Sequence, residues 1–168
     1  QIRAASNELN ELNRRLLAAV PKRGQHWKDL CEEFHRRYDA LFFPGGGVTL
    51  QTVRERDPAS VESAIRFLIA DPYHFRSGYT KEYLWRWFVH IPLSTGQRVR
   101  LEQAALTYID RKISREFWSL AKCMSRIGGP KFWLAIGTRV NSSAEPERSR
   151  ALLLLLFGAD VHTGSMAR

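Results

Sequence analysis

The chain has 168 residues, a formal net charge of +9 and only two cysteines. A chain of this length buries enough apolar surface to fold as one domain without disulfide or metal cross-links. Two cysteines exclude a disulfide framework and fit a reducing cytoplasm. No apolar run approaches the roughly 20 residues of a membrane span, and the first residues lack the apolar segment of a signal peptide. The sequence therefore predicts a cytoplasmic protein with no membrane segment.

The positive charge is distributed unevenly along the chain. Residues 58–140 hold 13 Lys and Arg against 6 Asp and Glu, whereas the residues before and after them are close to balanced. Arginine supplies 20 of the 26 cations, and its guanidinium group pairs with carboxylates and phosphates in a bidentate manner. The pattern fits an anionic partner, dense internal ion pairing or a simply solvated basic face, and composition leaves all three open.

Residues 1–43 carry apolar side chains at alternating spacings of three and four, which predicts a helical hairpin. The stripe of the first helix begins at Ile2 and ends at Ala19, before a proline and a glycine that stop the helix. The second predicted helix runs from His26 to Phe43. The first helix is expected to dock on its own domain. The alternative is a coiled coil or a partner helix, which normally needs more heptads.

The segment 44–57 is predicted to be a glycine-rich connector. Three consecutive glycines, Gly45 to Gly47, permit backbone conformations that other residues avoid. No Lys-Ser/Thr pair follows them, which excludes a phosphate-binding loop of the P-loop type. Apolar and polar residues then alternate from Val48 to Arg54, and this alternation predicts a short strand or an extended linker.

Residues 58–168 are predicted to form a stack of helices joined by short loops. An Asp-Pro pair supplies an N-cap and a first helical residue. It occurs at Asp57 and again at Asp71 and predicts a helix start at each position. Thr80 is the predicted cap of a helix that ends near Ile91. The other helices predicted before the last one span residues 97–112, 115–127 and 130–136.

The last predicted helix is apolar on every side from Leu152 to Phe157. A helix of this kind is buried on all sides or covered by a partner. Gly158 is predicted to end it as a C-terminal glycine. The stretch ALLLLLFGADVH, Ala151 to His162, resembles the end of an ankyrin repeat. The usual Thr-Pro-Leu-His opening is absent upstream and no second copy occurs, so the sequence assigns the chain to no family.

Together these elements predict an all-α protein of antiparallel helices with short loops, folded as a single domain over residues 1–168. Two architectures remain open at this point, a small α-solenoid of the helical-repeat type and an irregular helical bundle. A weak self-similarity at a separation of roughly 50 residues favours the solenoid, although true repeats have a sharper period.

The motifs of metal sites and of catalysis are missing. Cys31 and His35 share a helix face, and Glu32-x-x-His35 has the spacing of half a di-iron motif, but no second copy exists. The cysteine is expected in the core and the histidine at the surface. Carboxylates such as Glu116, which follows Arg115, are expected to form solvated surface pairs. The sequence therefore predicts no catalytic residue, no metal site and no cofactor.

The segment from Tyr79 to Ile91 combines expected core residues with expected contact residues. On a helical wheel Leu84, Trp87 and Phe88 share one side with Ile91 and are expected in the core. The opposite side is polar and aromatic, and aromatic and arginine side chains are the types that anchor interfaces. The candidate partner-binding residues are Tyr79, Tyr83, Arg86 and His90, together with a basic row on a helix predicted to start at Arg115, namely Arg115, Lys122 and Arg126.

These residues predict a non-enzymatic helical module that binds another protein, with an acidic protein as one option. The alternative is a sequence-independent nucleic-acid-binding protein. In that case the basic row and its neighbours Arg111, Lys112 and Lys131 would contact phosphates. The two tyrosines and Arg86 would add stacking on bases. A second alternative is an enzyme without a recognisable motif. The sequence identifies no particular partner and defines no oligomeric state.

Overall fold

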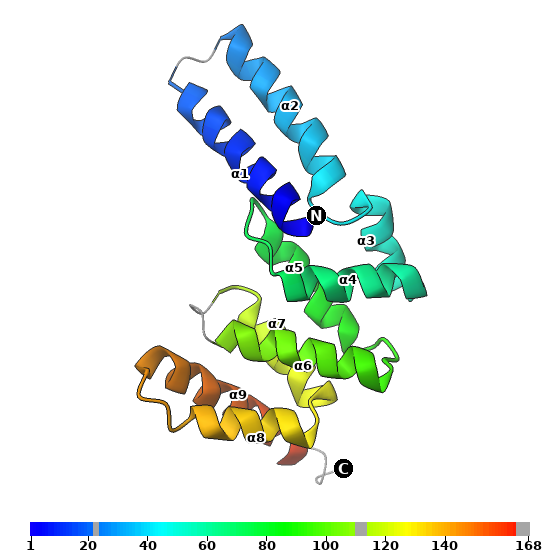
Figure 1. Cartoon of the computed structure of the whole chain (residues 1–168), viewed down its shortest axis with the longest axis vertical. Helices are drawn as coiled ribbons and strands as arrows, with labels where there is room; N and C mark the ends of the chain where they lie inside the picture. The colour runs from blue at the N-terminus through cyan, green and yellow to red at the C-terminus, as the bar shows by residue number, and fades with distance from the viewer. Residues whose placement is uncertain (22–23, 110–113, 164–168) are drawn as a thin grey trace. The chain divides into compact units, whose positions relative to one another are not determined.

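The structure, a computed structural model, describes residues 1–21, 24–109 and 114–163, with side chains as far as residue 158. Over these residues the chain forms α-helices joined by short loops, and no strand is present among them (Figure 1). The predicted all-α class is therefore confirmed. Contacts within the chain divide it into two compact units, an N-terminal unit of residues 1–78 and a C-terminal unit of residues 79–168.

The N-terminal unit contains four helices. They are α1 (Ile2–Ala19), α2 (Gln25–Leu41), α3 (Gly46–Arg54) and α4 (Pro58–Ala70). The first two run side by side as the predicted hairpin (Figure 1), α3 contacts both α2 and α4, and α4 also contacts α1. The contact between α4 and α1 brings the last helix of this unit back to the first and closes the core of the unit.

The core of the N-terminal unit comes from the predicted helical stripes. Leu9 on α1 and Phe34 on α2 are at most 5% exposed. Phe43, just after α2, packs against Phe67 of α4 with ring centroids 5.2 Å apart, and both rings are 1% exposed. Asp57 caps α4 as predicted, since its Oδ2 accepts a hydrogen bond of 2.8 Å from the backbone N–H of the third helical residue.

The prediction of a strand or extended linker within the connector 44–57 is wrong, because Gly46–Arg54 is the helix α3. Gly45 supplies its left-handed N-cap with φ 82°, and an added Cβ there would meet the Thr49 side chain at 2.1 Å. Val53, three residues after Leu50, is fully buried, whereas Val48 is 79% exposed. The spacing of three between Leu50 and Val53 fits a helix. Contacts of this segment with α2 and α4 stabilise the helix over the extended structure that the local alternation predicts.

The second Asp-Pro pair does not start a helix, which corrects the prediction at Asp71. This residue is the C-cap of α4 and lies in the left-handed region with φ 46°. The loop that follows is held by α1, because the carbonyl of Tyr73 accepts hydrogen bonds from Ser6 Oγ at 2.8 Å and from Asn10 Nδ2 at 2.6 Å. These bonds hold a loop where the local signal alone favours a helix.

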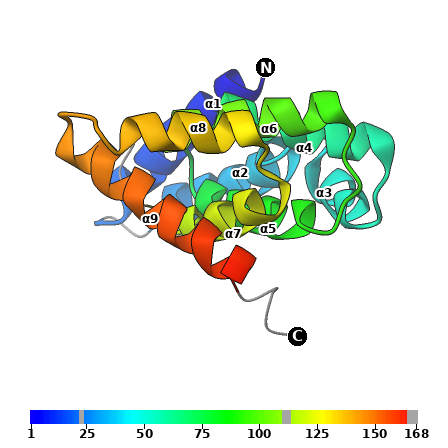
Figure 2. The same cartoon turned by 90° about the horizontal axis from the view of Figure 1, so that it is seen from below.

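The C-terminal unit contains the remaining five described helices, the first of which begins two residues before it. They are α5 (Ser77–Phe88), α6 (Thr95–Ile109), α7 (Phe117–Ile127), α8 (Pro130–Arg139) and α9 (Glu145–Thr163). Three helices, α6, α7 and α8, pack against α9. Figure 2 shows α8 and α9 joined at one end by their short loop. The last helix is therefore the central packing element of this unit.

Gly158 does not end the last helix, contrary to the prediction, because α9 continues to Thr163. The glycine instead allows a close approach of Trp133 from α8, since an added Cβ would lie 2.8 Å from its ring. The indole is fixed by a hydrogen bond of 3.1 Å from Nε1 to the carbonyl of Gly128. Glycine is therefore required at position 158 for close packing between α8 and α9, and it does not end the helix.

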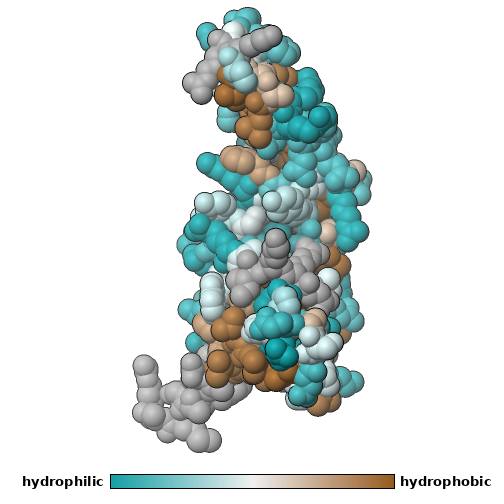
Figure 3. Space-filling model, turned by 90° about the vertical axis from the view of Figure 1, so that its left-hand side faces the viewer, coloured by the Kyte–Doolittle hydropathy of each residue, from teal (hydrophilic) through white to brown (hydrophobic). Residues whose placement is uncertain are grey.

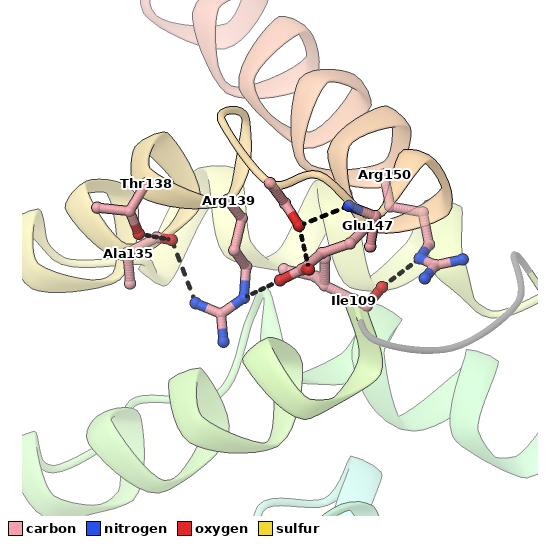
Figure 4. A network of polar contacts seen from close by, with 8 residues as sticks. Ile109, Ala135, Thr138, Arg139, Glu147 and Arg150 are labelled. Carbon is pink, nitrogen blue, oxygen red and sulfur yellow. Dashed lines mark hydrogen bonds and ion pairs between the residues drawn. The ribbon is translucent and has the colours of Figure 1, made fainter.

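A polar network joins α6, α8 and α9 (Figure 4). Arg150 is only 5% exposed and donates from Nε to the carbonyl of Ile109 at the C-terminal end of α6. A cation at this position complements the negative end of the helix dipole. Arg139 on α8 lies 3.4 Å from Glu147 on α9 and also donates to the carbonyl of Ala135. Part of the arginine content therefore stabilises the fold internally.

Candidate functional site

Two pairs of neighbouring charged residues meet where α5 contacts the turn before α7. On α5 they are Lys81 and Glu82, and in the turn they are Arg115 and Glu116. Arg115 Nε donates to Glu82 Oε2, and Lys81 Nζ lies 3.3 Å from Glu116 Oε1. Each residue therefore meets an opposite charge, and the two ion pairs fix the turn against α5.

The first ion pair belongs to a surface cluster of arginine and tyrosine side chains. The guanidinium of Arg115 lies over the ring of Tyr79, with its Cζ 4.2 Å from the ring centroid. Arg86 donates to the second oxygen of Glu82, so one carboxylate binds two guanidinium groups. The Glu82 side chain is 8% exposed, whereas those of Arg86 and Arg115 are 57% and 59% exposed. The carboxylate is buried while both cations stay accessible.

Tyr83 completes this group, and we call Tyr79, Glu82, Tyr83, Arg86 and Arg115 the arginine–tyrosine cluster. The ring of Tyr83 stacks on a tryptophan of the next turn of α5, with centroids 6.0 Å apart and planes at 17°. Nearly half of each tyrosine side chain is exposed. Four predicted contact residues, all except the glutamate, therefore lie together at the surface.

The core stripe predicted from Leu84 to Ile91 is correct at three positions and wrong at one, and α5 itself ends at Phe88. Leu84, Phe88 and Ile91 are buried. Trp87 is only half-buried and is the tryptophan that stacks on Tyr83, whereas Trp85 is fully buried. The helical wheel places both tryptophans near the border of the stripe, so neighbouring elements decide which of them is covered.

The second ion pair is buried, which corrects the expectation that Glu116 forms a solvated pair with Arg115. The side chains of Glu116 and Lys81 are each 5% exposed. Tyr108 of α6 donates its hydroxyl hydrogen to the same carboxylate, and its ring lies 5.5 Å from Lys81 Nζ. Burial raises the pKa of Tyr108, and the hydrogen bond to the carboxylate raises it further.

The charge state of Glu116 follows from its contacts. Burial acts to raise the pKa of its carboxyl group, but the hydrogen bond from Tyr108, the backbone and the nearby charge of Lys81 lower it by more. The net pKa lies below its ordinary value. The carboxylate is therefore ionised at neutral pH, although it is buried.

The other predicted contact residues are exposed but lie outside the arginine–tyrosine cluster. Lys122 and Arg126 lie one turn apart on α7, and no ion pair involves either side chain within the described part of the chain. His90 follows the C-terminus of α5 and makes no side-chain contact with the cluster in this same part. Arg111 and Lys112 lie outside the described residues.

The basic row also needs a correction of its helix start. Arg115 lies in the turn before α7, since the helix begins at Phe117. In this turn Ser114 forms a side-chain hydrogen bond with Glu116, and Arg115 binds Glu82. These contacts hold the residues in a turn where the sequence predicted a helix.

Two residues of this surface were missed by the sequence analysis. Glu82 was not singled out, because its role in binding two arginines depends on a turn 33 residues further along the chain. Trp118 is 48% exposed and lies one turn before Lys122 on α7. Its position four residues before that lysine was a usable signal, because such residues share a helix face.

The structure contains a cavity of 460 Å³ in the N-terminal unit. It lies between α1, the end of α2 and α4, and its lining is mostly apolar. Glu8 and His74 are its titratable lining residues. The first binds Arg37 of α2 and the second contacts Ser6 at 3.3 Å, so both are engaged in holding the unit together.

Other chemistry-bearing groups are dispersed. Within residues 1–21, 24–109 and 114–163, no three His, Cys, Asp or Glu side chains come together as metal ligands would. Cys31 is half-buried and Cys123 is fully buried, where burial raises the pKa of its thiol. None of the helices in the described ranges combines the length and apolar character needed to cross a membrane.

Comparison of the chain with protein-family models, with curated proteins and with solved structures found no match.

Proposed function

We propose that this chain is a non-enzymatic interaction module that binds an acidic segment of another protein through the arginine–tyrosine cluster and the exposed cations of α7. A helical-repeat architecture and a cytoplasmic location are part of the same proposal. The observation that supports it most is the geometry of Arg115, whose guanidinium is held in one place although more than half of the side chain is exposed.

An arginine held in this way is suited to bind a carboxylate. Its Nε is used by Glu82 and its face by Tyr79, which leaves the edge formed by its two terminal nitrogens for a partner. Arginine presents planar donors in a fixed arrangement that matches a carboxylate. Because the side chain is already ordered, binding costs less conformational entropy than it would for a mobile arginine.

The residue types of the arginine–tyrosine cluster support a protein partner over nucleic acid. The two guanidinium groups share one carboxylate and lie among tyrosine rings. Tyrosine and arginine are the side chains that most often dominate protein interfaces. An enzyme has less support, because Lys81, Tyr108 and Glu116 are at most 5% exposed and no substrate reaches them without a rearrangement.

Replacing Tyr79 with Ala is expected to weaken binding of an acidic peptide about fivefold, because it removes the ring on which Arg115 rests. The probe is a fluorescein-labelled, Glu-rich peptide of about 18 residues, five helical turns, whose affinity is measured by fluorescence anisotropy at low and at physiological salt. Tyr73→Ala is the matched control, because this tyrosine is 82% exposed and belongs to the N-terminal unit. It is expected to bind like the wild type.

Single-stranded RNA and duplex DNA are measured in the same assay. Tighter binding of either nucleic acid than of the peptide, with a steep loss on adding salt, would favour the nucleic-acid alternative instead. An equal effect of the two tyrosine substitutions would remove the arginine–tyrosine cluster from the site.

A further inference from the structure

The last helix has two apolar faces, and among the residues that the structure describes only one of these faces is covered. Ala151, Leu154 and Gly158 form the buried face. A second face carries Leu152, which is 42% exposed, and Leu156, which is 64% exposed. A helix that is apolar on every side is expected to be buried on all sides or covered by a partner. The exposed leucines leave one side of α9 available to a partner.

The second face is continued by an aromatic residue of α7. Trp118 packs against Phe157 with ring centroids 6.0 Å apart, and the indole remains 48% exposed. Leu153 and Phe157 are half-buried beside the more exposed leucines. Hydrophobic residues also gather at the surface of the C-terminal unit in Figure 3, brown in its lower part. We call Trp118, Leu152, Leu153, Leu156 and Phe157 the apolar ridge.

Basic side chains lie next to the apolar ridge. Trp118, Lys122 and Arg126 follow one another at spacings of four on α7, so they lie along one helix face. Both cations are exposed. The C-terminal unit as a whole holds 14 Lys and Arg against 7 Asp and Glu. Two copies of such a unit repel each other, which favours a partner of opposite charge over a second copy of this chain.

We propose that the apolar ridge binds an acidic amphipathic helix of another protein. The apolar stripe of that helix would cover Trp118, Leu156 and Phe157, and carboxylates at its border would pair with Lys122 and Arg126. Amphipathic helices commonly bind proteins by covering an exposed hydrophobic surface with their apolar face, and acidic flanks give such a helix the matching charge. This inference rests on the proposed function, because it specifies the acidic segment that the same unit binds.

The test compares three synthetic peptides of about 18 residues, five helical turns. The first has Leu at spacings of three and four with Glu at the flanking positions. The second has the same composition in scrambled order, and the third carries Lys in place of Glu. The first is expected to bind about tenfold more tightly than the second, the factor that corresponds to 1.4 kcal/mol.

Two sets of variants locate the binding surface. Leu156→Ser is expected to weaken binding of the first peptide about fivefold or more, whereas Leu17→Ser, 60% exposed on α1, leaves it unchanged. The double variant Lys122→Glu, Arg126→Glu is expected to prefer the Lys peptide over the Glu peptide. This reversal depends on charge at the α7 face and does not follow from a general loss of folding.

The outcomes separate the inference from the proposed function. Equal binding of ordered and scrambled Glu peptides would overturn the amphipathic helix and leave the acidic-segment module intact. Failure of both Glu peptides to bind would overturn both proposals. Sedimentation that shows a dimer lost on Leu156→Ser would also overturn the inference, because a second copy of the chain would then cover the ridge.

Discussion

Replacing Glu116 with Ala is expected to lower the free energy of unfolding by about 3 kcal/mol, because it removes one charge of a buried ion pair. The carboxylate lies 3.3 Å from Lys81 Nζ, both side chains are 5% exposed, and Tyr108 donates to the same oxygen. Urea denaturation followed by circular dichroism measures the effect. An exposed ion pair provides the comparison: Arg14→Ala breaks the contact with Glu11, whose side chain is 52% exposed, and is expected to change nothing measurable.

A double-mutant cycle isolates the ion pair from other consequences of the substitution. Lys81→Met and Glu116→Ala are each expected to destabilise the protein. Together they are expected to cost about 1–3 kcal/mol less than the sum of the single effects, as coupled neighbours do. Strict additivity would contradict the buried pair that the structure shows.

The pH dependence of stability provides an independent test of the ionised state of Glu116. The folded pKa of Glu116 lies below its ordinary value of 4.5, so its stabilising contribution is complete above that value. It is lost as the pH falls through the folded pKa, because the folded carboxylate must then bind a proton that the unfolded chain binds more readily. Glu116→Gln is therefore expected to flatten the acid side of the stability curve.

Replacing Gly158 with Val is expected to destabilise the protein by about 2–3 kcal/mol through overpacking. A Cβ at this position would lie 2.8 Å from the Trp133 ring, and that ring cannot move freely because Nε1 bonds to the carbonyl of Gly128. Thermal unfolding followed by circular dichroism measures the change.

Gly137 is the matched control for this substitution. It lies within α8, and an added Cβ would meet nothing within 4 Å. Gly137→Ala is therefore expected to be neutral or to stabilise the protein by up to about 1 kcal/mol, because alanine restricts the unfolded chain and favours helix. Similar losses at both glycines would show that the contact with Trp133 does not limit position 158.

Local sequence signals predicted the helices well wherever helical periodicity coincided with a terminus signal. Asp57 followed by proline started α4 as expected, whereas the same pair at Asp71 did not start a helix. The difference is tertiary, since the loop after Asp71 is bound by Ser6 and Asn10, more than 60 residues earlier in the chain. A local signal cannot contain that contact.

The candidate site shows the same limit. Residue types alone indicated Tyr79, Tyr83, Arg86 and Arg115. The structure places both arginines on one carboxylate, with Tyr79 under the guanidinium of Arg115. The carboxylate itself, Glu82, was not identified as a site residue. Its importance depends on how α5 meets the turn before α7, and a single sequence holds no record of which turn faces which helix.

Backbone amide hydrogen exchange with the ordered Glu peptide bound tests the central claim most directly. If the C-terminal unit binds an acidic segment through its arginine and aromatic side chains, protection should rise in residues 79–90, 114–126 and 152–157, and stay unchanged in α1 and α2. Protection confined to the N-terminal unit, or spread evenly over both units, would contradict the proposed site.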